Sequence, residues 1–540
     1  MAYTKQPTQD TYTTKRFPFV GSHNARNSSG SKDQRYVNCY PESIKNPLND
    51  GKRIYLIKRP GLTTQINPGN ASVGRGLFYW NGKVYNVFGS KLYANTTELQ
   101  TLGTSTGTVG FIAANGTTDY LFVCDGTDAY VVSTTDVVTK VNQTYSAWTA
   151  AATLAVGARR VPTVANSLYY EVTAITTGIT AGAEPTWPTT IGLTVVDGGV
   201  TWTCKGYYGG FPSPHIPTPV FADGYVFLPQ SGGDKIFNAD FDNPQSWNPI
   251  NYVSAEMYPD DLVGLARQNN QVVAFSTNST EYFYDAANVN TSPLARNDGG
   301  AQQIGCASYN TMVSFEQSMI FVGQSELGGR AVWLTEAFQP KKISIEWVDD
   351  VLDSEAANIS TANAFLIRVR GHQFYVLNLN SRTVVYDIDE KMWHEWSSNS
   401  SGNHSVFQCT FACDYLGEPL LQHTSNGKIY KLDTRTYQDD GTDILVEAVT
   451  SLIDLDDNNR KTCHTFTLIC DRTTTSSFAT LSYSDNDYGS WSAGRTLDLS
   501  TRPFLQSLGM FRRRAFKVTY TDNFPFRVEA LELYVNKHIA

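Results

Sequence analysis

The sequence lacks two kinds of segment that would attach it to a membrane or send it out of the cell. No stretch approaches the ~18 consecutive apolar residues that a membrane helix requires. The first residues, MAYTKQPTQDTYTTKRFPFVG, have no apolar core of the kind found in signal peptides. We therefore expect a soluble protein that is made in the cytoplasm and does not insert into membranes by itself.

Positive charge is also scarce. The chain has 42 Lys and Arg residues against 51 Asp and Glu residues, which leaves a formal net charge of −9. A protein that grips nucleic acid electrostatically needs a dense face of Lys and Arg to neutralise phosphates. The composition argues against such a grip, although DNA can still slide past an acidic protein.

Cysteine is sparse, with eight residues scattered over 540 positions. This distribution lacks the dense spacing of a secreted disulfide scaffold, so we expect reduced and mostly buried thiols. Cys409, Cys413 and His423 suggest a zinc site, but no second Cys pair follows at zinc-finger spacing. A structural role for these residues is favoured, and we expect neither a metal nor another cofactor.

Familiar catalytic motifs are missing, including G-x-S-x-G, H-E-x-x-H, the P-loop and the Rossmann glycine pattern. The segment SYSDNDYGSW approaches a sialidase Asp-box, but Asp487 and Gly489 are expected to shape a hairpin above Trp491. In WHEW, His394 and Glu395 fall on opposite faces of a strand. Packing is favoured there over acid–base catalysis.

A glycosidase needs two carboxylates in one cleft, and a sialidase also needs three arginines for its substrate. No such set stands out. Arg512, Arg513 and Arg514 are consecutive, and alternation along a strand would split them between two faces. A solvated or interfacial strand is the favoured interpretation, and we predict that the protein is not an enzyme.

What the sequence does contain is typical of β-sheets. Its 30 Tyr, 27 Phe and 41 Gly residues favour strands joined by tight turns. Seven segments repeat a pattern of strand, turn, strand, turn and strand, from LFYWNGKVYNVFGSKLY (77–93) to EPLLQHTSNGKIYKLD (418–433). Most of their turns are spaced like those of four-stranded propeller blades, with periods near ~40–50 residues, once 145–206 is treated as an insertion. The sequence predicts an all-β protein with a β-propeller, and six blades are favoured over seven.

The chain is longer than one hydrophobic core usually serves, so we expect more than one domain. The propeller should close by joining strands from both ends of its repeats in one blade, which removes an open edge. For the N-terminal arm two alternatives stay open: it lies across a neighbouring subunit, or one of its strands completes the last blade. The predicted parts are an N-terminal arm and first strands (1–60), propeller (61–144), an inserted Trp-rich small β module (145–206), more propeller (207–442) and a C-terminal β-sandwich (443–540).

Aromatic residues crowd the inserted module, for example in AGAEPTWPTTIGLTVVDGGVTWTCKG (181–206). So small a unit needs large aromatics for its own core, and this interpretation is favoured. Flat aromatic faces also match the C–H faces of sugars. Trp187 lies between two prolines and is expected to be the most exposed. The candidate contacts for a glycan or a protein are Trp187, Trp148, Tyr169 and Tyr170.

An ordered series of weak motifs follows the predicted blades. It includes FNADFDNPQSWNPINYVSAEMYPDDLVGLARQNNQVVAFSTNSTEYFYD (237–285), IGCASYNTMVSFEQSMIFVGQSELGGRAVW (304–333) and KKISIEW (341–347), with QRYVNCYPE (34–42) and KRPGLTT (58–64) before them. In these motifs the sequence resembles the packaged-DNA-stabilisation proteins of short-tailed bacteriophages, also called tail hub or nozzle proteins. The resemblance covers nearly the whole chain apart from 145–206.

The resemblance implies a structural protein of the virion tail that is assembled in the host cytoplasm. It implies a homo-oligomeric ring, expected to be a hexamer, below the portal and its adaptor ring and next to other tail proteins such as a tail fibre, tailspike or needle. The ring would retain packaged double-stranded DNA and then serve as its conduit during ejection. An acidic protein suits a conduit, because it does not hold phosphate. The alternative is a glycan-binding or glycoside-hydrolysing β-propeller protein that acts on the host surface.

Overall fold

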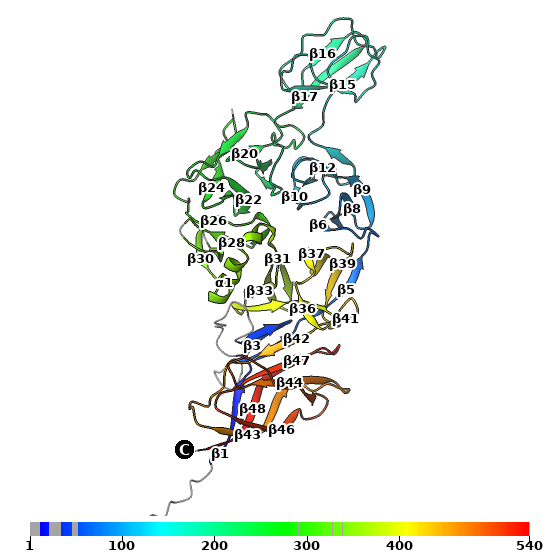
Figure 1. Ribbon diagram of the computed structural model, residues 1–540. Coiled ribbons are helices and arrows are strands. Elements are labelled where there is room, and N and C mark those ends of the chain that lie inside the picture. The colour runs from blue at the N-terminus through cyan, green and yellow to red at the C-terminus, as the bar shows by residue number, and fades with distance from the viewer. Residues whose placement is uncertain are drawn as a thin grey trace, which may run out of the picture.

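Seven small antiparallel sheets form a ring of blades in the computed structural model, which describes residues 11–20, 34–45, 52–289, 291–326, 328–336 and 338–538 (Figure 1). Successive strands are joined by tight turns, many of which place Asn, Asp or Gly at positive φ, the conformation that these residues adopt most easily. The fold is therefore an all-β propeller, as the sequence predicts.

The first four blades each contain four strands in chain order. Between blades 2 and 3 the chain leaves the ring and returns. The strands of these blades are β6 (Gly74–Trp80), β7 (Lys83–Phe88), β8 (Lys91–Ala94) and β9 (Thr97–Thr101); β10 (Gly110–Ala114), β11 (Tyr120–Cys124), β12 (Ala129–Ser133) and β13 (Val138–Lys140); β18 (Val220–Ala222), β19 (Tyr225–Pro229), β20 (Lys235–Asn238) and β21 (Tyr252–Ser254); and β22 (Leu262–Gln268), β23 (Gln271–Ser276), β24 (Thr280–Asp285) and β25 (Leu294–Arg296).

The remaining blades contain the described helical segments as well. The 3₁₀ turn η1 (Tyr309–Thr311) lies inside blade 5, and α1 (Glu346–Ser354) and η2 (Ala356–Thr361) connect blade 5 to blade 6. The strands are β26 (Gly305–Cys306), β27 (Val313–Phe315), β28 (Ser318–Gln324), β29 (Ala331–Glu336) and β30 (Gln339–Lys342); β31 (Asn363–Val369), β32 (His372–Asn378), β33 (Thr383–Asp387) and β34 (Met392–Trp396); and β37 (Cys409–Tyr415), β38 (Glu418–His423) and β39 (Ile429–Asp433).

Blade 7 is completed by a strand from the other end of the repeats. β5 (Gly61–Ile66) pairs antiparallel with β39, so the ring closes by hydrogen bonds between segments far apart in the sequence. This confirms the expected mode of closure, but the preference for six blades is wrong. The count failed because β5 lies outside all seven sequence repeats, so closure adds a strand to the last repeat and does not merge two repeats into one blade.

Hydrophobic side chains are buried between successive blades. Val87 of blade 1 packs with Leu121 of blade 2, and Val385 of blade 6 packs with Leu421 of blade 7. Within the described residues, each of the seven blade interfaces has such a cluster, including the one between blades 7 and 1, where Ile429 packs with Val84. Burial of apolar surface at these interfaces is the main force that holds the ring together.

Strands from both ends of the chain form two further sheets beside the propeller (Figure 1). Their facing sides share one core, in which Phe466 and Leu531 of the first sheet join Phe516 and Val518 of the second. The first sheet contains β1 (Thr11–Pro18), β3 (Cys39–Lys45), β4 (Lys52–Lys58), β43 (Lys461–Cys470), β46 (Phe504–Phe511) and β48 (Arg527–Lys537), and the second contains β2 (Arg35–Val37), β42 (Val446–Val449), β44 (Phe478–Ser484), β45 (Arg495–Asp498) and β47 (Ala515–Tyr520).

The described strands of the N-terminal arm pair inside the chain. β1 and β4 lie along β48, and β2 runs between β34 of blade 6 and β42. Strand pairing between chain ends leaves no local pattern in the sequence, so the sequence does not predict this arrangement. The alternative of a strand that completes the last blade agrees with β5, which begins where the arm ends, and a contact with a neighbouring subunit stays a prediction. Residues 1–10, 21–33 and 46–51 of the arm lie outside the described residues. The five boundaries of the predicted division stay a prediction.

The inserted module projects from the ring at the end opposite the two terminal sheets (Figure 1). Its sheet has the order β14-β15-β17-β16, formed by β14 (Arg159–Arg160), β15 (Leu168–Ile175), β17 (Val200–Tyr207) and β16 (Thr194–Asp197). It has a core of its own around Trp202, Val172 and Leu168. Two short pairs, β35 (Ser398–Ser400) with β36 (Asn403–Ser405) and β40 (Gln438–Asp439) with β41 (Thr442–Asp443), flank blade 7. No described helix is long and apolar enough to span a membrane.

Closure of the ring depends on a close backbone approach at Gly61. This residue begins β5, and a Cβ added to it would overlap the carbonyl oxygen of Gln438 and lie 2.6 Å from the Gln438 nitrogen. We expect Gly61→Ala to lower the free energy of unfolding by about 1–3 kcal/mol, because backbone must move to make room. Gly233→Ala is the matched control, since nothing lies within 4 Å of its added Cβ. Chemical denaturation of both variants checks this, and equal stabilities would contradict it.

Candidate functional site at the junction of the propeller and the terminal sheets

The residues suggested by catalytic or metal motifs have structural roles. Cys409 is buried and pairs in register with His423 across β37 and β38. Burial raises the pKa of the Cys409 thiol and raises that of Cys413 to about 12, so both stay protonated at neutral pH. The Nδ1 atom of His423 accepts a hydrogen bond from the Ser425 backbone N–H at 3.0 Å. Among the described residues no group of three or more His, Cys, Asp or Glu side chains could hold a metal ion.

The Asp-box-like segment forms a tight turn. Asp487 and Tyr488 have positive φ values of 55° and 64°, as a turn requires. Trp491 packs against Tyr488, with ring centroids 6.1 Å apart, and Lys517 Nζ lies 4.6 Å from the Trp491 ring centroid. The prediction of a hairpin turn with Trp491 packed beside it is confirmed.

The three consecutive arginines lie in the link between β46 and β47, so the prediction that they occupy a strand is wrong. Arg513 is exposed and pairs with Asp487. Arg514 is almost fully buried, and its Nε and Nη2 atoms donate to the two carboxylate oxygens of Asp485 at 2.6 and 2.7 Å. Its guanidinium carbon lies 4.0 Å from the ring centroid of Tyr483. A buried and paired arginine of this kind fixes the link and leaves no cation free for a substrate.

The WHEW segment forms β34, and its side chains alternate as predicted. Trp396 packs in the cluster between blades 6 and 7, whereas Trp393 packs in the cluster between blades 5 and 6. Glu395 accepts hydrogen bonds from Arg35 Nε and Nη2, both at 2.8 Å. Burial lowers the pKa of Arg35, but the hydrogen bonds and charge of Glu395 outweigh it and raise that pKa above its ordinary value. Glu395 therefore anchors β2 to blade 6.

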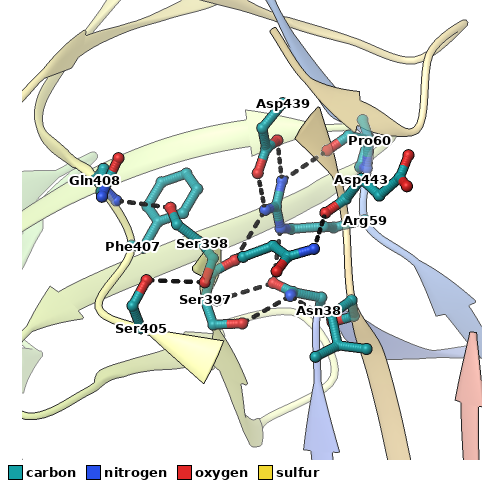
Figure 2. A network of polar contacts seen from close by, with 12 residues as sticks. Asn38, Arg59, Pro60, Ser397, Ser398, Ser405, Phe407, Gln408, Asp439 and Asp443 are labelled. Carbon is teal, nitrogen blue, oxygen red and sulfur yellow. Dashed lines mark hydrogen bonds and ion pairs between the residues drawn. The ribbon is translucent and has the colours of Figure 1, made fainter. Parts of the chain in front are cut away.

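A second arginine at the same junction lies at the centre of a polar network (Figure 2). Arg59 lies between β4 and β5, and its side chain has 0% exposure. Its five N–H groups are all used: Nε donates to Asn38 Oδ1 at 2.8 Å, Nη1 to the Pro60 carbonyl at 3.1 Å and Asp439 Oδ1 at 2.9 Å, and Nη2 to the Ser397 carbonyl at 3.1 Å and Asp439 Oδ2 at 2.5 Å.

Asn38 extends this network to the terminal sheets. It has a φ of 56°, a left-handed conformation that asparagine tolerates better than most residues. Its Nδ2 atom donates to Ser397 Oγ at 2.8 Å and to the Leu445 carbonyl at 2.7 Å, and its Oδ1 atom accepts the Ser397 backbone N–H at 2.8 Å (Figure 2). Asn38 and Arg59 thus join the ends of blades 6 and 7 to the start of β42.

A buried pair of a histidine and an aspartate lies nearby. His372 Nδ1 is 2.7 Å from Asp387 Oδ2, and the His372 ring makes an edge contact with Tyr40 of β3, with centroids 5.1 Å apart. Burial lowers the pKa of His372, but the hydrogen bond and charge of Asp387 outweigh burial and raise that pKa above its ordinary value. Arg35, Arg59 and His372 at this junction are therefore each paired with a carboxylate inside the protein, which suits a mechanical joint.

Two of the four aromatic candidates, Trp148 and Tyr170, lie in the core of the inserted module. Trp148, Tyr169 and Tyr170 are buried, so the hypothesis that these three offer flat faces to a ligand does not hold. The indole N–H groups of Trp148 and Trp202 donate to Asp197 Oδ2 at 2.7 and 2.9 Å. Tyr170 OH donates to the Pro188 carbonyl at 2.9 Å. A small unit uses its large rings for packing, which the favoured interpretation anticipated.

Trp187 is half-buried. Its ring lies on that of Tyr170, with centroids 4.3 Å apart, and makes an edge contact with Trp202 at 5.6 Å. Its Nε1 atom donates to Glu184 Oε1 at 2.8 Å. The four candidate residues are not gathered on one face: Tyr169 stacks on Tyr145 at the root of the module, with centroids 4.9 Å apart. Contact of Trp187 with a glycan or a protein stays a prediction.

The axis of the propeller is crossed by a hydrogen bond. Thr108, just before blade 2, donates through Oγ1 to Asn310 Oδ1 of blade 5 at 2.7 Å. These two blades are not neighbours around the ring, so their residues meet near its centre. The η1 turn that carries Asn310 also contacts β22, β28 and β31 of blades 4, 5 and 6. The centre of the propeller is therefore occupied by protein.

Sequence reasoning missed Arg59, Asn38 and Asp439. The available signal was weak: an arginine between an apolar strand and a proline, in LIKRPGL, suggests a turn as readily as a buried guanidinium. The partners of Arg59 come from positions near 38, 397 and 439, and only the folded chain brings them together.

Taken together, these features define an all-β propeller protein with a buried polar network where the propeller meets the terminal sheets. Residues 213–437 match the family model described as bacteriophage P22 Gp10, beta-propeller. This part of the chain is therefore similar to a family of phage tail β-propeller proteins that stabilise packaged DNA. No curated protein matches the sequence.

Three solved structures illustrate how far the likeness extends beyond that family. The extracellular domain of a putative one component system from B. thetaiotaomicron is 11% identical with a TM-score of 0.38, and the match covers 76% of this chain but only 43% of the other. BamB from Moraxella catarrhalis is 12% identical with a TM-score of 0.31, over 69% and 97% of the two chains. An exo-β-1,3-galactanase from Phanerochaete chrysosporium is 10% identical with a TM-score of 0.22, over 79% and 95%. Similarity at this level supports no inference about function.

Replacing Arg59 should cost more stability than replacing an arginine of an exposed ion pair. We expect Arg59→Met to lower the free energy of unfolding by about 3–5 kcal/mol, because it leaves the Asp439 carboxylate and the Asn38 amide without their partner. Arg513→Met, which removes an exposed ion pair, should change it by less than ~1 kcal/mol. Urea denaturation of both variants measures the difference, and a stable Arg59→Met protein would contradict a central role for the network.

The His372–Asp387 pair predicts a pH dependence. The raised pKa of folded His372 means that its stabilising charge is fully present below the unfolded pKa of about 6.5 and is lost as pH rises through the folded pKa. We expect His372→Gln to destabilise the protein more at pH 5.5 than at pH 9. Denaturation of both proteins at both pH values tests this, and an equal or larger effect at pH 9 would refute it.

Proposed function

We propose that the chain is the structural subunit of a ring-shaped tail hub or nozzle, which lies below the portal and its adaptor ring in the virion. The ring, a homohexamer in this proposal, retains packaged DNA and serves as its conduit during ejection. The observation that carries the proposal is the match of residues 213–437 to a phage propeller family. Assembly takes place in the host cytoplasm, and a tail fibre, tailspike or needle protein completes the tail.

The occupied propeller axis supports one form of this proposal. Because Thr108 and Asn310 meet across the centre, a duplex does not pass through the propeller of a single subunit. The conduit is instead the central opening of the ring, and each propeller is part of its wall. A wall must stay rigid under the pressure of packaged DNA, and the pairing of β5 with β39 in blade 7 fastens the two ends of the repeat region to each other.

Charge and connectivity also support a conduit. A formal net charge of −9 disfavours adhesion to DNA phosphates, which would otherwise slow ejection. The Arg59 network joins the propeller to the terminal sheets, so load on one part reaches the other through a buried contact. We assign the predicted five-part division to this protein as its domain organisation, with the module as a detachable insertion.

Electron microscopy of the purified protein with a portal–adaptor complex tests the proposal. We expect sixfold density below the adaptor. The portal without its adaptor is the control and should show no such density, because the proposed contact is with the adaptor ring. A protein that stays monomeric and does not bind the portal–adaptor complex would rule the proposal out.

A further inference from the structure

The root of the inserted module contains a small pocket that the proposed function does not use. Its volume is about 140 Å³, and it lies where the two connecting segments of the module meet blade 3. Five aromatic side chains line it: Tyr145, Tyr207, Tyr208, Phe211 and Trp247. The module and the propeller both contribute, so the pocket exists only when the two are packed together.

The rings of this pocket are held in place by contacts behind them. Tyr145 stacks on Tyr169, whose ring centroid lies 5.5 Å from the guanidinium carbon of Arg159. Phe211 meets Trp247 edge to face, with centroids 5.2 Å apart, and the Trp247 indole donates to the Pro244 carbonyl at 2.9 Å. Fixed rings lose little freedom when a ligand binds, which favours binding by a small pocket.

The lining carries no charged side chain. Its other members are Val141, Asn142, Gln143, Thr144, Gly209 and Ser213. An anionic ligand would find no cation there, and a lysine or arginine from a partner would find no carboxylate. The ligand that suits this lining is therefore uncharged.

Some polar groups of the pocket already have hydrogen-bond partners in the protein, and others do not. The amide of Gln143 donates to the Lys140 carbonyl at 2.9 Å, and the Ser213 hydroxyl donates to the Thr127 carbonyl at 3.0 Å. In contrast, the phenol oxygens of Tyr207 and Tyr208 have no hydrogen-bond partner within the described parts of the chain. A ligand with its own hydroxyl groups can pair with both phenols and still lay an apolar face on a ring.

We propose that this junction pocket binds one neutral pyranose residue, a hexose or an N-acetylhexosamine. A pyranose combines an apolar C–H face with hydroxyl groups around its rim, which matches aromatic rings beside two free phenols. The volume of about 140 Å³ is below the ~300–1,000 Å³ of pockets for drug-sized ligands, so it suits one ring and not a longer chain. This site is separate from the buried core that contains Trp148, Tyr170 and Trp202.

Saturation-transfer NMR on the full-length protein provides the test. The probes are the methyl glycosides of glucose, galactose, mannose and N-acetylglucosamine, with glucuronic acid as the charged comparison. We expect transfer to at least one neutral glycoside and none to glucuronic acid. No transfer to any neutral glycoside, or equal transfer to the charged sugar, would overturn the proposal.

Two tyrosine variants locate the site. Tyr208→Ala should weaken binding by about fivefold or more, because it removes a ring contact and a phenol. Tyr284→Ala removes an exposed tyrosine of blade 4 that is not part of the pocket, and it should bind like the parent protein. Thermal melting confirms that both variants fold. Equal binding by a folded Tyr208→Ala protein, or loss on Trp187→Phe alone, would show that the sugar binds elsewhere and overturn the assignment.

Discussion

The buried guanidinium of Arg59 is the interaction on which the attachment of the terminal sheets to the propeller depends. An arginine without solvent is stable only when its charge is paired and its N–H groups are all hydrogen-bonded. Arg59 reaches this state because Asn38, Ser397, Pro60 and Asp439 converge on it (Figure 2). These partners belong to the N-terminal arm, the ends of blades 6 and 7 and the link into the terminal sheets. The network therefore forms only when all of these parts are in place.

Closure of the propeller and attachment of the terminal sheets consequently use consecutive segments of the chain. β4 pairs with β48 of the terminal sheets, Arg59 follows, and β5 then completes blade 7. A chain that crosses from one body to the other at this point cannot release the sheets without disturbing the closing strand. This connection suits a rigid tail component, because a force on the terminal sheets acts on the propeller through buried backbone and the Arg59–Asp439 ion pair.

The inserted module is stabilised by its own core and not by the Arg59 network. Its core of Trp148, Tyr170 and Trp202 is complete in itself, with two indole N–H groups satisfied by the buried carboxylate of Asp197. Rings that look like a ligand platform in the sequence are needed inside so small a unit. Aromatic side chains remain accessible where the module meets the propeller, because neither part alone can cover that surface. The chemistry of the junction pocket, neutral and rich in phenols, follows from this position.

Local patterns in the sequence determined the class of fold, the alternation of Trp393 and Trp396 in β34 and the Asp487 turn. Each of these depends on the period of a strand or the conformation of a turn, which neighbouring residues set. Tertiary structure alone decided the seventh blade, the burial of Arg514, the pairing of β1 with β48 and the partners of Arg59. The seventh blade, the β1–β48 pair and the contacts of Arg59 with Ser397 and Asp439 join residues hundreds of positions apart, and Arg514 meets Asp485 29 positions away. A residue type carries no record of which distant segment will pair with it.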